Sequence, residues 1–328
     1  MNSGKACLET AEYRAAVETE EQLDACLESK RVQLVWIDSA SFSPQKYGDI
    51  VKRAHSAGVS CGLRTPYIWR REAEAFFDAV QTELAQAGFD AWLFRNAEGA
   101  LYFREHGLTE QANFVTDHSM YVWNREAEQV LLEMLGTKAV PEAETDRRGI
   151  DRNREIVKHT SVPSGITLPL ELNLRELSSL CKSLQTPAEL IVYGRAPMMV
   201  SAQCLRKTTG ECRKNLQGKG AGRAGENVGL QSGYGIKTVQ DTGEILYLKD
   251  RTGAEMPVRN YCRFCYNIIY NSVPTVIFDL EKEIRQISPH SVRYEFSTES
   301  GPETFAVLEG KVPKGNGAFT RGHLHRGV

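Results

Sequence analysis

Short apolar runs alternate with amphipathic segments along most of the chain. The apolar runs are rich in β-branched and aromatic residues and too short for helices, a pattern that favours strands buried on both faces. Between them, apolar residues recur at helical spacing, and Thr19 with Gln22 forms the capping-box pattern of a helix start. Strands are predicted at 12–17, 32–38, 59–64, 91–94, 112–118, 166–173, 189–193 and 291–296.

Helices are predicted between most of these strands. They span 19–27, 43–57, 70–87, 98–106, 124–135, 174–184, 281–287 and 301–309. Eight strands, most of them followed by a helix, predict an α/β fold of the TIM-like (β/α)8 barrel type. An open doubly wound sheet is the alternative, but no Gly-x-Gly-x-x-Gly pattern follows an early strand to support a dinucleotide fold.

The predicted barrel spans residues 1–311 and carries two additions. Residues 137–165 are highly charged and predict an exposed insertion, while 204–265 form a cysteine-bearing region. Within that region, 216–235 is a Gly-rich loop, and 245–258 is a predicted hairpin that turns at 251–253. The C-terminal tail, 312–328, could fold back over the barrel mouth, although a frayed end is the default expectation.

Composition narrows the protein class. The chain has 328 residues, a net charge of −2 and eight cysteines. A chain with this net charge has no overall excess of positive charge to attract nucleic acid, so an RNA partner would need a local patch of basic residues. No run approaches the roughly 18 apolar residues of a membrane span, and no apolar leader is visible. Cysteines in such a chain favour reduced thiols or metal ligands, and we expect a cytoplasmic protein without a membrane partner.

Polar residues follow the predicted strands at the points where the strands end. In a parallel barrel these ends meet at one face, where the active sites of such folds lie. The candidate catalytic residues are Asp117, His118, Glu171, Arg195 and Glu295, within a wider set that includes Asp38, Arg64, Arg95, Asn96, Asn173 and Glu299. His118 is the best acid–base candidate because histidine titrates near neutrality. The alternative is a ring of salt bridges that closes the barrel top.

Four cysteines lie close together in the sequence and could share an inorganic centre. Cys262 and Cys265 form a C-x-x-C pair, and Cys204 and Cys212 precede them. Four thiolates suit either zinc or an iron–sulfur cluster, and the presence of a single C-x-x-C pair leans toward a cluster. Reduced cysteines without metal are the alternative. The remaining thiols are expected to be small apolar fillers: Cys7, Cys26, Cys61 and Cys181.

Several segments resemble the collagenase-like peptidases, also called peptidase family U-32. The similar segments are 168–173, 189–204, 249–265 and 319–323, and the likeness is closest to the C-terminal part of long, two-part members. The resemblance implies a TIM-like barrel. From relatives that hydroxylate RNA bases or quinone precursors without molecular oxygen, it also implies a [4Fe–4S] cluster held by four cysteines.

The resemblance carries over to individual cysteines. Cys204 matches the second cysteine of the family signature, Cys212 falls near the third, and Cys262 with Cys265 match the pair of the long members. The usual first cysteine falls at Pro197, which departs from the family pattern.

Three functions follow as hypotheses. The first is an iron–sulfur enzyme related to oxygen-independent hydroxylases and RNA-modifying enzymes. The second is a genuine peptidase acting on collagen-like or other peptides, although no nucleophile elbow or His-Glu-x-x-His is present. The third is a non-catalytic partner barrel with a structural metal site, which docks onto an N-terminal-type homologous barrel. The expected partners are therefore that barrel or an RNA or peptide substrate.

Overall fold

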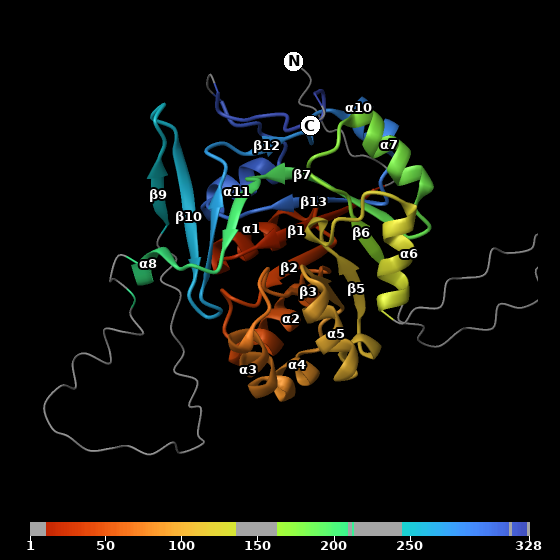
Figure 1. Ribbon diagram of the computed structural model, residues 1–328, viewed down its shortest axis with the longest axis vertical. Coiled ribbons are helices and arrows are strands. Elements are labelled where there is room, and N and C mark those ends of the chain that lie inside the picture. The colour runs from red at the N-terminus through yellow and green to blue at the C-terminus, as the bar shows by residue number, and fades with distance from the viewer. Residues whose placement is uncertain (1–10, 136–162, 209–211, 213–244, 315–316, 327–328) are drawn as a thin grey trace, which may run out of the picture.

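A ring of parallel strands forms the centre of the molecule (Figure 1). The computed structural model describes residues 11–135, 163–208, 212, 245–314 and 317–326. In these residues, β7 pairs with both β13 and β6, and this second pairing closes the sheet into a barrel. The predicted barrel is confirmed, and the open sheet is excluded. The strands are β1 (Glu12–Val17), β2 (Leu34–Asp38), β3 (Ser60–Arg64), β4 (Ala91–Phe94), β5 (Asn113–Thr116), β6 (Gly165–Thr167), β7 (Ala188–Gly194) and β13 (Ser291–Glu295).

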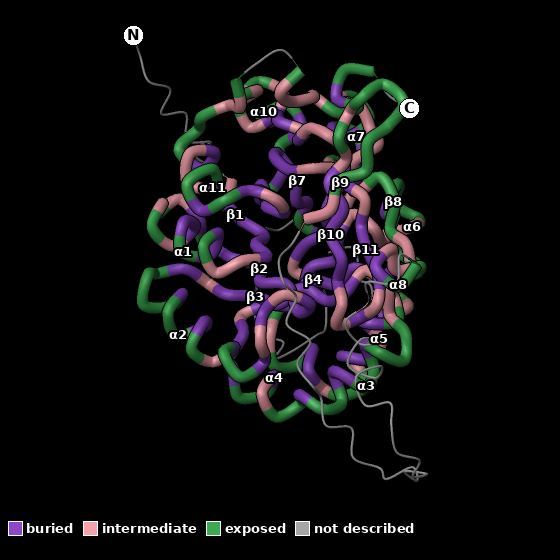
Figure 2. Tube along the Cα trace, turned by 90° about the vertical axis from the view of Figure 1, so that its left-hand side faces the viewer, coloured by how far each residue is buried: buried purple, intermediate pink, exposed green. Residues whose placement is uncertain are grey.

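Helices surround the strands and shield them from solvent (Figure 2). Capping boxes fix the starts of three of them, at Thr19, Asn173 and Ser300. The helix predicted over 70–87 is wrong in one respect, because Val80 leaves helical geometry (φ −115°, ψ 17°) and divides it in two. The helices are α1 (Glu20–Ser29), α2 (Tyr47–Ser56), α3 (Arg71–Ala79), α4 (Gln81–Ala87), α5 (Ala97–Glu105), α6 (Arg125–Met134), α7 (Leu174–Ser183), α10 (Glu281–Ile287) and α11 (Gly301–Leu308), with 3-10 turns η1 (Pro44–Lys46), η2 (Leu108–Glu110) and η3 (His118–Met120).

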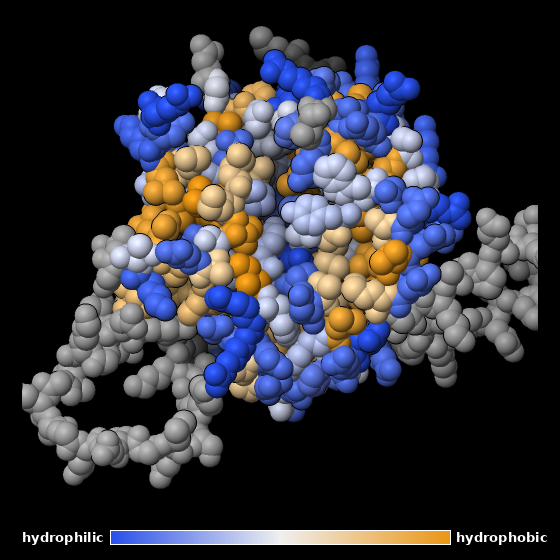
Figure 3. Space-filling model, in the orientation of Figure 1, coloured by the Kyte–Doolittle hydropathy of each residue, from blue (hydrophilic) through white to orange (hydrophobic). Residues whose placement is uncertain are grey.

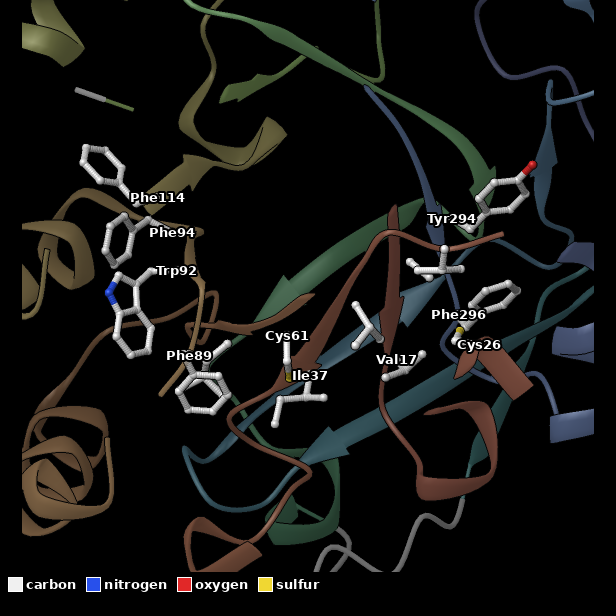
Figure 4. Close-up of a cluster of buried hydrophobic side chains, with 14 of the residues drawn as sticks. Val17, Cys26, Ile37, Cys61, Phe89, Trp92, Phe94, Phe114, Tyr294 and Phe296 are labelled. Carbon is white, nitrogen blue, oxygen red and sulfur yellow. The ribbon is translucent and has the colours of Figure 1, made fainter. Parts of the chain in front are cut away.

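Two apolar cores hold the barrel together. The larger lies between strands and helices, where the rings of Trp92, Phe94 and Phe114 pack beside the aliphatic residues of neighbouring strands (Figure 4). The smaller fills the barrel interior around Trp36. Its indole requires glycine at position 62, because a Cβ there would lie 2.3 Å from the ring. Buried Cys26 and Cys61 belong to the larger core, as expected of apolar fillers.

A second, antiparallel sheet is inserted after β7. Its strands run in the order β8 (Pro197–Ser201), β11 (Tyr266–Tyr270), β10 (Glu255–Tyr261) and β9 (Leu246–Lys249), and the short helix α8 (Leu205–Thr208) follows β8. The predicted hairpin is confirmed as β9–β10, where Asp250 accepts the backbone N–H groups of Thr252 and Ala254. Beyond it, β12 (Thr275–Val276) adds antiparallel to β7.

Some predicted boundaries are corrected by the structure. The strand predicted over 166–173 ends at Thr167, and the chain then passes through Pro169, which has no N–H group for a strand ladder. The strand predicted over 112–118 ends at Thr116, because the Asp117 side chain caps η3. Gly165, placed in the predicted insertion, belongs to β6. Residues 137–162 of that insertion, the Gly-rich loop (216–235) and Cys7 lie outside the described residues.

The C-terminal tail folds back onto the barrel, so the default expectation of a frayed end is wrong for residues 317–326. Thr320 forms a β-bridge with Thr275, and Arg321 forms an ion pair with Asp279. Leu324 is buried at 5% exposure. In the described part of the chain, no helix combines the length and apolarity needed to cross a bilayer.

Candidate functional site

Inward-facing charged side chains fill the upper half of the barrel. Arg64 contacts Glu18 at 2.7 Å, Asp38 at 2.8 Å and Glu295 at 2.7 Å. Arg95 forms a further ion pair with Asp38. These groups are almost completely buried, apart from a partly exposed Glu295. Buried charges of this kind persist only when paired, so the salt-bridge interpretation holds for these rim residues.

A second set of ion pairs centres on Arg293, which is fully buried. Its guanidinium contacts Asp117 at 2.5 Å, Glu189 at 2.5 Å and Glu295 at 2.6 Å. Glu189 also contacts Arg14 at 3.1 Å. Glu189, Glu295 and Arg14 come from β7, β13 and β1, and Asp117 directly follows β5, so the network ties together strands that are distant in sequence.

Asp117 is part of this network rather than a free base. Burial alone would raise its pKa, but the positive charges of Arg293, His118 and Arg95 outweigh burial and hold the pKa well below the usual aspartate value. One carboxylate oxygen of Asp117 also accepts the backbone N–H of His118 at 2.8 Å. The carboxylate therefore stays ionised and bound to Arg293 and to the His118 backbone.

The β10–β11 hairpin covers one side of the barrel mouth. Tyr261 donates to Glu18 at 2.7 Å, and Arg259 contacts the same carboxylate at 2.6 Å. Arg263 donates to backbone carbonyls of the β2–α2 connection. Phe264, 1% exposed, stacks on Phe77. The mouth is thus closed above β1, β2 and β3.

A pocket of about 460 Å³ remains on the other side of the mouth, above β5, β6 and β7. Four of the predicted site residues line it: His118, Glu171, Arg195 and Glu295. The fifth, Asp117, does not. The pocket lies at the carboxyl ends of parallel strands, where the ligands of such barrels bind.

The pocket-lining side chains differ in how firmly they are held. His118 Nε2 lies 3.2 Å from the Tyr67 hydroxyl, and the Arg95 guanidinium stacks 4.5 Å from the centre of the same tyrosine ring. Arg195 is fixed by Thr298 and two backbone carbonyls. Glu171 makes no hydrogen bond or ion pair within the described residues. The pocket therefore offers two histidines, His118 and His323, and the carboxylate of Glu171 as groups able to exchange protons.

Several pocket residues escape prediction from sequence. Thr320, Arg321, His323 and Leu324 of the tail line the pocket, and Tyr270 reaches it from the end of β11. The sequence indicated only that the tail could fold back over the barrel mouth, because the contact itself depends on a pairing between residues 275 and 320.

The structure brings three of the four candidate cysteine ligands to one end of the small sheet. Cys262 and Cys265 lie in the turn that joins β10 to β11, and Cys265 adopts a positive φ of 56°. Antiparallel pairing of Ser201 with Asn267 carries Cys204 toward the same end. The backbone N–H of Leu205 donates to the Asn267 side chain at 3.1 Å, which fixes this approach. Cys212 follows α8 and is partly exposed, and none of the described cysteines forms a disulfide.

The donor types suit an iron–sulfur cluster, and one nearby polar group supports the fit. Asn260 pairs across the hairpin with Asn267, is 2% exposed, and has no hydrogen-bond partner for either amide atom among the described residues. Such a buried amide is costly unless a ligand satisfies it. However, no three described His, Cys, Asp or Glu side chains are gathered closely enough to hold a metal ion. The cysteines fit by type and location, but not by present side-chain arrangement.

No family model and no curated protein matches the chain. Among solved structures, thiamine phosphate pyrophosphorylase from Pyrococcus furiosus is 7% identical, with 56% of this chain and 75% of that chain covered at a TM-score of 0.33. Muconate lactonizing enzyme from Pseudomonas putida is 12% identical, with 55% and 46% covered and a TM-score of 0.32. Tryptophan synthase from Mycobacterium tuberculosis is 9% identical, with 55% and 74% covered and a TM-score of 0.34.

Proposed function

We propose that this chain is an iron–sulfur enzyme of the collagenase-like peptidase family, related to oxygen-independent hydroxylases and RNA-modifying enzymes. The observation that carries the proposal is the approach of Cys204 to the Cys262/Cys265 turn, beside the unsatisfied amide of Asn260. Thiolates are the usual ligands of such clusters, and Cys212 would complete the set. When bound, a [4Fe–4S] cluster supplies one-electron redox chemistry.

The cysteines and the pocket occupy opposite ends of the small sheet. Met198 and Tyr270 line the pocket, whereas Cys204 and Cys265 lie beyond the other ends of β8 and β11. Five residue steps along β11 correspond to roughly 16 Å between the α-carbons of Cys265 and Tyr270. The proposal therefore assigns substrate binding to the pocket, with the small sheet connecting the two regions.

Within the pocket, the chain's own side chains would bind and orient the substrate. His118 and Glu171 are placed to hold or move a proton, while the β10–β11 hairpin and the tail exclude water. Nucleophilic peptide hydrolysis has less support. Among the described pocket-lining residues, no serine or threonine hydroxyl is hydrogen-bonded to a histidine.

A second candidate function is the partner barrel, and one observation favours it. Both edge strands of the small sheet expose apolar side chains: Met198 is 63%, Met199 56% and Tyr247 59% exposed. Hydrophobic residues gather on this side of the molecule in Figure 3. Exposed apolar edge strands offer unpaired backbone groups to another chain. A homologous N-terminal-type barrel would cover them, with zinc or a cluster as a structural centre.

The test is metal content after oxygen-free purification. The proposal predicts brown protein that contains iron and inorganic sulfide in equal amounts. Replacing Cys262 or Cys265 by serine should remove both. Cys181→Ser is the matched control, because this partly buried thiol donates to the Ser288 carbonyl, far from the small sheet, and should leave the iron in place. Colourless protein without iron would reject the cluster, and zinc in its place would favour the partner barrel.

A further inference from the structure

The pocket contains a cation that is held in place but has no counter-charge. Arg195 Nε donates to the Thr298 hydroxyl at 3.0 Å, and its Nη1 donates to the backbone carbonyls of Asn271, at 3.1 Å, and Ser272. Within the described residues, Nη2 makes no hydrogen bond, and no carboxylate lies within ion-pair distance. The guanidinium is therefore preorganised, with the two N–H groups of Nη2 left to donate to a ligand.

The pocket also contains an anion without a partner. Glu171 follows β6, the strand next to the one that carries Arg195, yet the two side chains do not form an ion pair. The described residues also offer no hydrogen bond to the Glu171 carboxylate. The chain therefore keeps two opposite charges apart in one pocket instead of neutralising them.

The other charged residues that line the pocket are already paired. Glu295 contacts two arginines, Arg95 contacts Asp38, and Arg321 contacts Asp279. Glu18 and Arg64 contact each other at 2.7 Å. Of the described arginine and glutamate residues lining the pocket, only Arg195 and Glu171 have no oppositely charged partner within the described residues.

The wall of the pocket is mostly apolar. Its aliphatic residues include Leu168, Leu170, Leu190, Ile191 and Ile277. A volume of about 460 Å³ lies within the range of small-molecule sites, about 300–1,000 Å³, which is enough for a dipeptide. The surfaces therefore suit a molecule with one positive end, one negative end and an apolar body.

We propose that the pocket binds a zwitterionic apolar amino acid or dipeptide, with its carboxylate on Arg195 and its ammonium on Glu171. The Nη2 N–H groups of Arg195 can donate charge-assisted hydrogen bonds to a carboxylate, and a free carboxylate such as Glu171 accepts ammonium hydrogen bonds readily. This inference deepens the proposed function and rests on it only in taking the pocket as the substrate site. A neutral nucleobase would leave both charges unpaired.

The test is calorimetric titration with three probes that differ by one charge each. Leucyl-leucine carries both charges, N-acetyl-leucyl-leucine lacks the ammonium, and leucyl-leucinamide lacks the carboxylate. We expect leucyl-leucine to bind, and each capped probe to bind about tenfold or more weakly, because one charge-assisted contact is lost.

Pocket variants assign each charge to its residue. Glu171→Gln should bind leucyl-leucine and its acetylated form equally, while Arg195→Gln should no longer distinguish leucyl-leucine from the amide. Arg195→Lys keeps the charge and should retain part of the discrimination, which covers the case of a poorly folded glutamine variant. The matched controls are Glu105→Gln and Arg251→Gln, both exposed and outside the pocket. They should behave as wild type.

Three results would overturn the inference: no binding of any probe at millimolar concentration, equal binding of all three, or full discrimination retained in both pocket variants. Tighter binding of uridine or adenosine than of leucyl-leucine would also overturn it, in favour of a nucleobase. Iron and sulfide are measured on the same samples. If the cluster is absent but the protein still distinguishes leucyl-leucine from its capped forms, only the proposed function is contradicted. If the cluster is present but the three probes bind equally, only this inference is contradicted.

Discussion

Replacing Arg293 by methionine tests the buried ion-pair network. Arg293 is fully buried and has three carboxylate partners, but the expected loss is not three times that of one pair. Glu189 keeps Arg14, and Glu295 is partly exposed and keeps another arginine. Among the described residues, Asp117 alone loses its one ion pair with an arginine. One uncompensated buried charge costs about 3–5 kcal/mol, which is therefore the expected decrease in the free energy of unfolding near neutral pH.

The same substitution should reverse the way in which Asp117 makes the free energy of unfolding depend on pH. In the wild type, burial opposes the effect of Arg293 but does not outweigh it, and the pKa of Asp117 lies well below its unfolded value of about 3.9. Its contribution to stability is therefore complete above that value and decreases as acid protonates the folded state. Without Arg293, burial dominates and raises the pKa. The variant should then be least stable relative to wild type near neutral pH, and the deficit should shrink as the pH falls toward the unfolded value of about 3.9.

Urea unfolding followed by tryptophan fluorescence measures both effects. Arg285→Met is the matched control, because this exposed arginine makes only a 3.5 Å pair with Glu281 and should lose less than about 0.5 kcal/mol. Adding Asp117→Asn to Arg293→Met should recover part of the loss, because the unpaired charge is then absent. A deficit below about 1 kcal/mol that does not change with pH would refute the reasoning.

Three further substitutions test the packing of the barrel and its covers. Gly62→Ala should lower the free energy of unfolding by about 1–3 kcal/mol, because the new methyl would meet the Trp36 ring at 2.3 Å; unchanged urea unfolding would contradict this packing. Phe264→Ala should lower the free energy of unfolding by about 3–5 kcal/mol and speed amide exchange in β10 and β11, because Phe264 anchors the hairpin on Phe77. Amide exchange at the wild-type rate in these strands would show that the ring is not an anchor. Leu324→Ala should lower the free energy of unfolding by about 2 kcal/mol. It should also weaken the protection from hydrogen exchange of the Leu174 amide, which donates to the Leu324 carbonyl at 2.9 Å. Full protection of that amide would mean that the position of the tail does not depend on this side chain.

The barrel could be predicted from sequence because its signals are local. Alternating apolar strands and capped helices such as the one starting at Thr19 need only neighbouring residues. The break at Val80 was missed because nothing in the local helical pattern around it interrupts the spacing. The second sheet was only half predicted, because β8 and β11 pair residues more than 60 positions apart, such as Ser201 with Asn267.

The site could be predicted only in part, for the same reason. The rule that barrel strands end at one face led to His118, Glu171, Arg195 and Glu295, and all four line the pocket. It could not reveal that Asp117 is engaged, because its partner Arg293 lies 176 positions away inside another strand. Sequence spacing likewise cannot decide how closely the four sulfur atoms approach one another.

The central claim is that four cysteines of this chain hold an iron–sulfur cluster, and X-ray absorption at the metal edge tests it most directly. On protein purified without oxygen, we predict iron coordinated by sulfur alone, with neighbouring iron atoms in the scattering. Replacement of Cys262 should abolish that signal. Zinc with sulfur ligands and no second metal, or iron bound by oxygen and nitrogen, would contradict the claim.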